Sequence, residues 1–217
     1  MLKRLIIILF VLPLAISCNR KESSNLNHLK ETIMIKQFHK PEQFKNILYC
    51  YYIYQEIIEP EVITPQIFVK YVQGGSLTLK YIDQYNTWLG TVDGKKCKKL
   101  VGNSFEIISD NYIEKNSKTD SNKIEYGVFL NLLAIKQDGK SPQQIYNHEL
   151  LHVAFAQHIE HRHRILKSWD GLSDENQTEF KSKHSGYKFT NKKLLMKEYF
   201  SYTFQHNVKK GLRFLLD

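Results

Sequence analysis

The sequence predicts an α+β fold in which a small sheet packs on a helix that carries the string HELLH at positions 148–152, followed by a helical part. Two observations indicate this fold. Residues 105–113 and 124–135 are rich in β-branched and aromatic side chains, which is typical of strands. The segments after residue 140 instead combine helix-capping residues with apolar residues at helical spacing.

The N-terminus predicts export. Residues 1–4 are basic, residues 5–14 form an apolar run too short for a mature membrane span, and Cys18 follows a small residue. We therefore expect residues 1–17 to be a signal peptide. This segment resembles a bacterial lipoprotein signal, which implies that Cys18 is lipidated and anchors the chain to a membrane of the cell envelope. Asn19 after the cysteine favours the outer membrane or the periplasmic face in this resemblance.

The chain has 217 residues, so one domain with a sizeable core is expected once the signal is removed. Residues 18–40 are polar after the cysteine and lack a sustained apolar period, so we expect a tether there. The single domain would span residues 41–217, with the sheet in residues 41–140 and the helical part in residues 141–217.

Capping and breaking residues give the order of elements. Residues 41–58 are aromatic-rich and fit a helix or a strand equally well. The remaining expectations are a helix over 65–73 capped by Thr64 and ended by Gly74 and Gly75, a helix over 77–89 ended by Gly90, strands over 105–113 and 124–135 around the loop 114–122, and a turn at 137–139.

The HELLH string lies on a predicted helix, because Ser141, Pro142 and Gln144 form a capping box that starts one. Two histidines four residues apart lie on one face of a helix, so His148 and His152 can reach one zinc ion. Glu149 would lie beside the ion as a general base. The string therefore predicts a zinc-dependent hydrolase.

A zinc ion needs a third protein ligand, and the sequence offers three candidates. His158 fits a second known spacing, but Phe155 stands where that spacing needs a glycine, and a continued helix would turn His158 away. His184 lies in a loop that could fold over the site. Glu198 is favoured, because it lies in the middle of a mostly apolar helix capped by Thr190 or Asn191, where a buried carboxylate needs a cation.

The string HELLH followed 46 residues after His152 by KEYFSYTF from Lys197 onwards resembles the gluzincin metallopeptidases, and most closely the catalytic domains of the anthrax lethal factor type. The resemblance covers roughly the last 75 residues. It implies a zincin-like fold, with Glu198 as the third zinc ligand. Ser201 and Tyr202 stand where that family often has an acidic residue behind a zinc histidine.

The function we expect is hydrolysis of peptide bonds in a peptide or protein substrate, with Glu149 as general base and Tyr187 as the stabiliser of the oxyanion. His184 and Tyr202 are alternatives for the role of Tyr187. The second candidate function is an inactive lipoprotein of the same fold that acts as a binding or structural module. A metal amidase acting on cell-wall peptide cross-links is a third.

Charge and cysteine content indicate less about the function than the HELLH string does. The net charge of +9 is spread over many segments and accompanies no nucleic-acid-binding motif, so a nucleic-acid partner is not expected. Cys50 and Cys97 could form a disulfide in an exported protein, but nothing in the sequence requires one. The sequence leaves the oligomeric state open.

Overall fold

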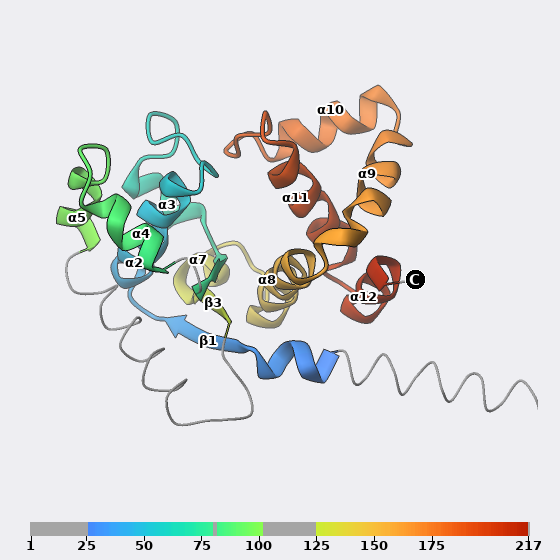
Figure 1. Ribbon diagram of the computed structural model, residues 1–217, viewed down its shortest axis with the longest axis horizontal. Coiled ribbons are helices and arrows are strands. Elements are labelled where there is room, and N and C mark those ends of the chain that lie inside the picture. Colours follow the sequence, from blue (N-terminus) through green and yellow to red (C-terminus); the bar gives the residue numbers. More distant parts are fainter. Residues whose placement is uncertain (1–25, 80–81, 102–124, 217) are drawn as a thin grey trace, which may run out of the picture.

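The computed structural model describes residues 26–79, 82–101 and 125–216 (Figure 1). In chain order the elements are β1 (Ile33–Phe38), α2 (Pro41–Tyr54), α3 (Pro65–Tyr71), β2 (Gly74–Thr78), α4 (Ile82–Leu89), α5 (Lys95–Val101), β3 (Tyr126–Asn131), α7 (Leu132–Gln137), α8 (Pro142–Gln157), the 3-10 turn η2 (Ile159–His161), α9 (Arg162–Asp170), α10 (Asp174–Lys183), α11 (Lys192–Phe204) and α12 (Val208–Leu216). The fold is α+β, as expected.

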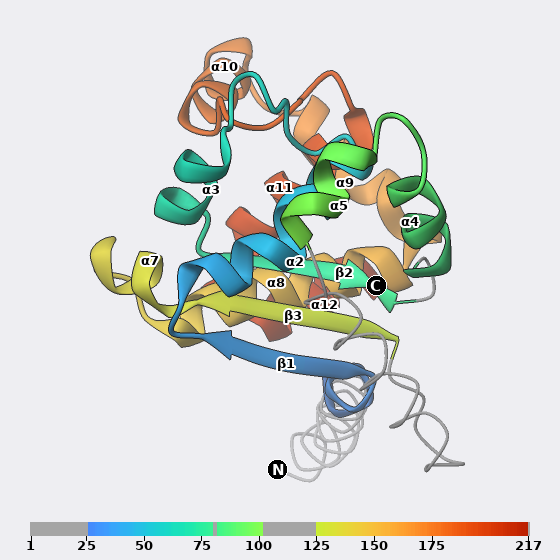
Figure 2. The ribbon, with the colours of Figure 1, turned by 90° about the vertical axis from the view of Figure 1, so that its left-hand side faces the viewer.

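The described sheet has three strands in the order β1-β3-β2, which lie side by side in Figure 2. β3 runs parallel to β1 and antiparallel to β2. All six residues of β3 are buried because helices cover both faces of the sheet. Phe129 packs with residues of α2 on one face, whereas Val128 and Leu130 pack with residues of α8 on the other.

Two hydrophobic clusters therefore form, one on each side of the sheet. The first joins the sheet to α2, α3, α4 and α5, and the second joins it to α8, α9, α11 and α12. In Figure 1, α8 lies between the N-terminal helices and the C-terminal helices. This central position explains why α8 is apolar nearly all round, with buried residues from Ile145 to Phe155.

The helical expectations are largely confirmed. Residues 41–54 form a helix, which settles the segment that the sequence left undecided. The Thr64 side chain accepts a hydrogen bond from the Ile67 amide and caps α3. The turn expected at 137–139 is present, with Gly139 at a φ of +68°.

Three expectations near the sheet need correction. Gly74 and Gly75 begin strand β2 instead of only ending a helix, so the helix expected over 77–89 begins at Ile82. The strand expected over 124–135 covers Tyr126–Asn131, because the Asn131 side chain accepts a hydrogen bond from Ala134 and starts α7. The strand expected over 105–113 and the loop over 114–122 lie outside the described residues.

The tether expected over residues 18–40 is too long. Within it, Ile33–Phe38 form strand β1, which pairs with β3, so the folded part begins before residue 41. The sequence hides this strand because it is a six-residue edge strand, IMIKQF, in which only the two end residues, Ile33 and Phe38, are buried. The cleavage and lipidation expected at residues 1–18 lie outside the described residues.

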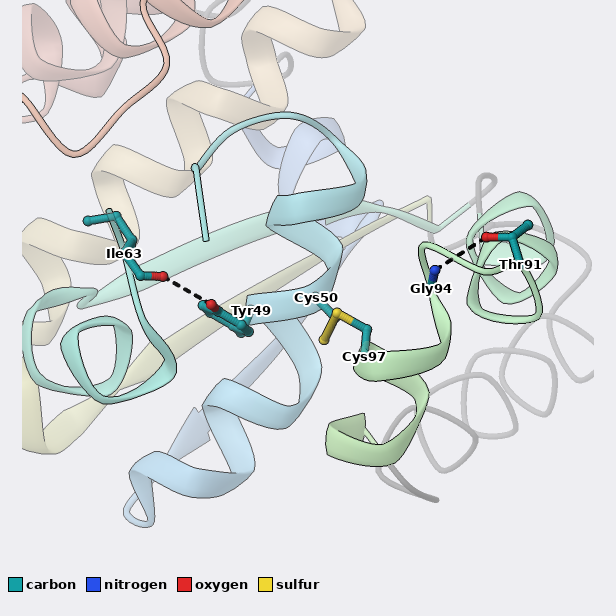
Figure 3. Close-up of a disulfide and its surroundings, with 6 residues drawn as sticks. All are labelled: Tyr49, Cys50, Ile63, Thr91, Gly94 and Cys97. Carbon is teal, nitrogen blue, oxygen red and sulfur yellow. Dashed lines mark hydrogen bonds between the residues drawn. A yellow bond between two sulfur atoms is a disulfide. The ribbon is translucent and has the colours of Figure 1, made fainter. Parts of the chain in front are cut away.

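A disulfide joins Cys50 of α2 to Cys97 of α5, with 5.6 Å between their Cα atoms (Figure 3). Next to it, the Tyr49 hydroxyl donates a hydrogen bond to the Ile63 carbonyl, at 3.0 Å. The Gly94 amide donates to the Thr91 hydroxyl, at 3.3 Å, at the turn before α5. The disulfide attaches α5 to α2, and the Tyr49 hydrogen bond attaches the segment before α3 to α2. In the part of the chain that the structure describes, no helix has the length and apolar character needed to cross a bilayer.

Candidate metal centre

Helix α8 places three functional side chains at the centre of the protein. Its start is fixed by the Ser141 hydroxyl, which accepts a hydrogen bond from the Gln144 amide as the capping motif predicts. His148, Glu149 and His152 follow two turns later, and all three are buried. A buried polar side chain needs a partner, so these residues need groups from another element.

Helix α11 supplies the partner. The Asn191 side chain caps it by accepting hydrogen bonds from the amides of Lys193 and Leu194, which confirms the expected helix start. Glu198 lies in the middle of α11 and is only 1 % exposed. Because α11 packs against α8, its carboxylate faces the two histidines of α8.

The geometry suits a metal ion. Glu198 Oε2 lies 3.4 Å from Nε2 of His148 and 3.4 Å from Nε2 of His152. Ligand atoms at the corners of a tetrahedron around zinc, with bonds of about 2.0 to 2.1 Å, lie about 3.3 Å apart. His152 Nε2 and Glu198 Oε2 are buried and have no hydrogen-bond partner among the described residues. A cation held between these two buried atoms would give both of them a partner.

The electrostatics agree with this geometry. Burial acts to raise the pKa of Glu198, but the positive charge of His152 and the contacts with both histidines hold it well below the usual value. Burial acts to lower the pKa of His152, but the Glu198 and Glu149 carboxylates outweigh it and raise that pKa. The Glu198 carboxylate is therefore ionised and needs a positive charge beside it, which a protonated histidine or a metal ion can supply.

Glu149 lies next to this group. Its Oε2 is 3.2 Å from Nδ1 of His152. Burial acts to raise its pKa, but the nearby charges of His152 and His148 lower it overall, so Glu149 is an ionised carboxylate that can accept a proton.

Three tyrosines surround the carboxylates. Burial, followed by the charge of Glu198, raises the pKa of Tyr187 and of Tyr202, and burial followed by the charge of Glu149 does the same for Tyr52. All three hydroxyls therefore stay protonated and remain hydrogen-bond donors. The Tyr202 ring lies 4.4 Å from the His148 ring, centroid to centroid. Tyr52 was missed in the sequence because its segment fitted a helix or a strand, so no face could be assigned to it.

The other proposed ligands lie elsewhere. Among the described residues, the side chains that converge for a metal are His148, His152 and Glu198. Helix α8 ends at Gln157, and His158 follows it as the C-cap with its ring near Glu160, at 3.7 Å. His184 stacks on Tyr202 at 4.0 Å instead of joining the group. The Ser201 hydroxyl is buried and has no partner in the described part of the chain.

Two separate cavities border this centre. One of about 470 Å³ is lined by His148 and Glu149 together with Gly74, Tyr187 and Tyr202. The other, of about 690 Å³, is lined by His152. His148 and Glu149 thus border one cavity, and His152 borders the other.

Comparison of the chain with protein-family models, with characterised proteins and with solved structures found no match. The functional conclusion therefore depends on the residues of the site and their geometry.

Proposed function

We propose that this protein is a zinc-dependent peptidase of the cell envelope with a zincin-like fold. The observation that carries the proposal is the convergence of His148, His152 and Glu198 from two packed helices, with the ionised Glu149 beside them. Two histidines and a glutamate are a known ligand set of catalytic zinc, which leaves a coordination position open.

Zinc, when bound by these three residues, supplies a Lewis acid that polarises a carbonyl and makes water more acidic. Glu149 would accept the proton of the attacking water and then deliver it to the nitrogen of the leaving amine, so that one peptide bond and one water give a carboxylate and an amine. The Tyr187 hydroxyl lines the same cavity as Glu149 and keeps its proton, so it can donate a hydrogen bond to the carbonyl oxygen as negative charge develops there.

Strand β2 provides a binding edge for an extended substrate. The Gln73 carbonyl accepts from Asn131 and the Leu79 amide donates to Glu125, so the odd-numbered residues of β2 face β3. Gly74, Ser76 and Thr78 therefore direct their backbone groups away from β3. Gly74 lines the cavity at Glu149, whereas Ser76 and Thr78 line the cavity at His152. A peptide paired with this edge would cross the metal centre.

Location in the envelope is part of the proposal. It starts from the expected signal peptide and the expected lipid anchor at Cys18. The disulfide between Cys50 and Cys97 supports it, because such bonds persist in oxidising compartments outside the cytosol.

The first test is the amount of zinc per chain, measured by plasma mass spectrometry on the purified full chain. We expect about one zinc per wild-type chain, a large loss in Glu198→Ala, and no loss in the matched control His158→Ala. A folded wild-type chain that takes up no zinc, even when zinc is added, would contradict the proposal.

One observation favours the second candidate, an inactive protein of the same fold. The buried Ser201 hydroxyl lacks a partner among the described residues and stands where an acidic side chain could orient a zinc histidine. This candidate predicts zinc binding without peptide hydrolysis, and no effect of Glu149→Gln in any assay of function.

A further inference from the structure

The cavity on the His152 side contains a concentration of positive charge. Arg162, Lys193 and Lys197 all line it. Glu125, at the end where β3 begins, is the one carboxylate among the described residues that line it. No carboxylate in the described part of the chain lies within ion-pair distance of Arg162 or Lys193, and Lys197 reaches only the Glu198 carboxylate, at 4.0 Å.

Arg162 and Lys193 occupy unfavourable positions. Arg162 is the first residue of α9, where the helix dipole is positive, and the first turn of α9 has no acidic residue. Lys193 and Lys197 are four residues apart on α11, so two like charges lie on one face of that helix. Burial, followed by the charges of Arg162 and Lys197, lowers the pKa of Lys193, so the three cations lie close enough to repel one another.

The Arg162 side chain is held in place although it lacks a counter-ion. Its guanidinium lies 4.5 Å from the centroid of the Phe155 ring, on helix α8. Its Nε atom is buried and has no hydrogen-bond partner among the described residues. The nearest acidic influence is Glu160, which is exposed and pairs with His158 and His161. A fixed guanidinium with an unused donor is the usual arrangement for binding a carboxylate.

From this juxtaposition we propose that the cavity on the His152 side is a subsite for an acidic side chain of the peptide substrate. A carboxylate bound there would meet Arg162 and Lys193 at once and relieve their mutual repulsion. The inference rests on the proposed peptidase function, because the bound peptide is a substrate only if the chain is a peptidase. The binding of an acidic peptide can be measured without catalysis.

The direction of β2 places this acidic residue relative to the bond that is cut. β2 runs from Gly74 at the Glu149 cavity to Thr78 at the His152 cavity. A peptide paired antiparallel to β2 would begin near Thr78 and end near Gly74. The acidic residue would therefore lie on the amino side of the scissile bond, and the carboxylate would be a side chain and not the C-terminus of the peptide.

The test uses the full chain carrying Glu149→Gln, purified in detergent, with zinc and separately with EDTA. Its probes are two pools of fluorescein-labelled decapeptides with amidated C-termini, which are identical except that one pool has two glutamates where the other has two glutamines. We expect the glutamate pool to bind about tenfold more tightly, and the preference to disappear when Arg162→Gln and Lys193→Gln are added together. The single variant Lys193→Gln, measured in the same way, should reduce the preference in part.

The matched control is the double variant Lys167→Gln and Lys192→Gln, which removes the same net charge from the same two helices outside the cavity. It should keep the preference. Equal binding of the two pools, or a loss of preference in the control that equals the loss in the cavity variant, would overturn the inference.

The results that would contradict the peptidase proposal differ from those that would contradict the anion subsite. A chain that prefers the glutamate pool in EDTA as well as with zinc, and that hydrolyses no peptide, keeps the anion subsite and loses the peptidase. A zinc-loaded wild-type chain that cuts both pools equally well, as measured by mass spectrometry of the products, keeps the peptidase and loses the subsite.

Discussion

At the scale of single residues, the site depends on an ionised carboxylate that lies next to a histidine. Glu149 is buried, and the charges of His152 and His148 lower its pKa overall, so it is ready to accept a proton. Its neighbour Glu198 has a different task because its Oε2 points at both histidines. Two buried glutamates from two helices are thus assigned different roles by their contacts alone.

We predict that Glu149→Gln keeps zinc and loses turnover by a factor of about 10² to 10⁴, because the amide has the shape of the carboxylate but cannot accept the proton. Peptide hydrolysis and zinc content should be measured on the same sample. Glu175→Gln, an exposed change on α10, is the control and should behave as wild type. Full activity in Glu149→Gln would remove this residue from the chemistry.

We also predict an acid-dependent loss of stability in the metal-free chain. The folded-state pKa of Glu198 lies below its unfolded value, so its contribution is complete above about pH 4.3 and is lost as the pH falls through the folded pKa. Thermal melts in EDTA should show Tm falling more steeply with acid for wild type than for Glu198→Gln. Parallel curves of Tm against pH for the two proteins would mean that the ionised Glu198 carboxylate does not stabilise the folded chain.

At the scale of elements, close packing between β2 and α8 sets the position of Glu149. A Cβ atom at Gly74 would lie 2.6 Å from Cγ2 of Ile145 and 3.1 Å from Cγ of Glu149. Any larger residue must therefore push the strand away from the helix that carries the site. The glycine is required by this approach and not by its backbone conformation.

We predict that Gly74→Ala lowers both the rate of peptide hydrolysis and the free energy of unfolding, the latter by about 1 to 3 kcal/mol, because it overpacks this contact. Urea unfolding and a peptide assay would measure the two effects. Gly171→Ala is the matched control, since its new Cβ would have ordinary contacts at 3.4 and 3.6 Å. If Gly74→Ala has the same hydrolysis rate and free energy of unfolding as this control, β2 can move away from α8 without loss of stability.

The disulfide between α2 and α5 gives a second prediction at this scale. It closes a loop with a sequence separation of 47 residues, so replacing both Cys50 and Cys97 by alanine should lower the free energy of unfolding by about 2 to 4 kcal/mol. Urea unfolding with and without a reductant measures this. The reductant should destabilise wild type and leave the double variant unchanged; an effect on both would point to another cause.

The sequence predicted the convergence of His148, His152 and Glu198 better than it predicted the sheet. Helices α8 and α11 carry caps at Ser141 and Asn191, and the spacing along each helix then indicates which side chains share a face. Strands β1 and β2 are five or six residues long, and β2 begins with two glycines, which read as a helix end in the sequence. Which tyrosine lies near Glu149 depends on long-range packing, so Tyr52 was not found.

At the scale of the whole molecule, α11 connects the two hydrophobic clusters. Leu194 belongs to the cluster around α2, whereas Phe200 belongs to the cluster around α8, and Glu198 lies between them in the chain. A metal ion held by Glu198 and the histidines of α8 would therefore hold α11 against both halves of the core. Metal binding would then stabilise the whole fold.

We predict that removing zinc with a chelator lowers Tm, and that adding zinc at a thousand times its dissociation constant restores about 4 kcal/mol of stability. Differential scanning calorimetry at several zinc concentrations would measure it. Glu198→Ala is the control and should show no response to zinc. An unchanged Tm for wild type across the zinc series would exclude a metal ion as a support of the fold.

The parallel pairing of β1 with β3 determines when β1 can join the sheet as the chain is synthesised. Ile33 pairs with Tyr126, so β1, the first strand among the described residues, cannot pair with β3 until more than ninety further residues have been made. At roughly 5 to 20 residues per second, this wait lasts roughly 5 to 20 seconds. During that time the backbone groups of β1 that will bond to β3 are unpaired by it, so the closure of the described sheet depends on a strand that is made much later.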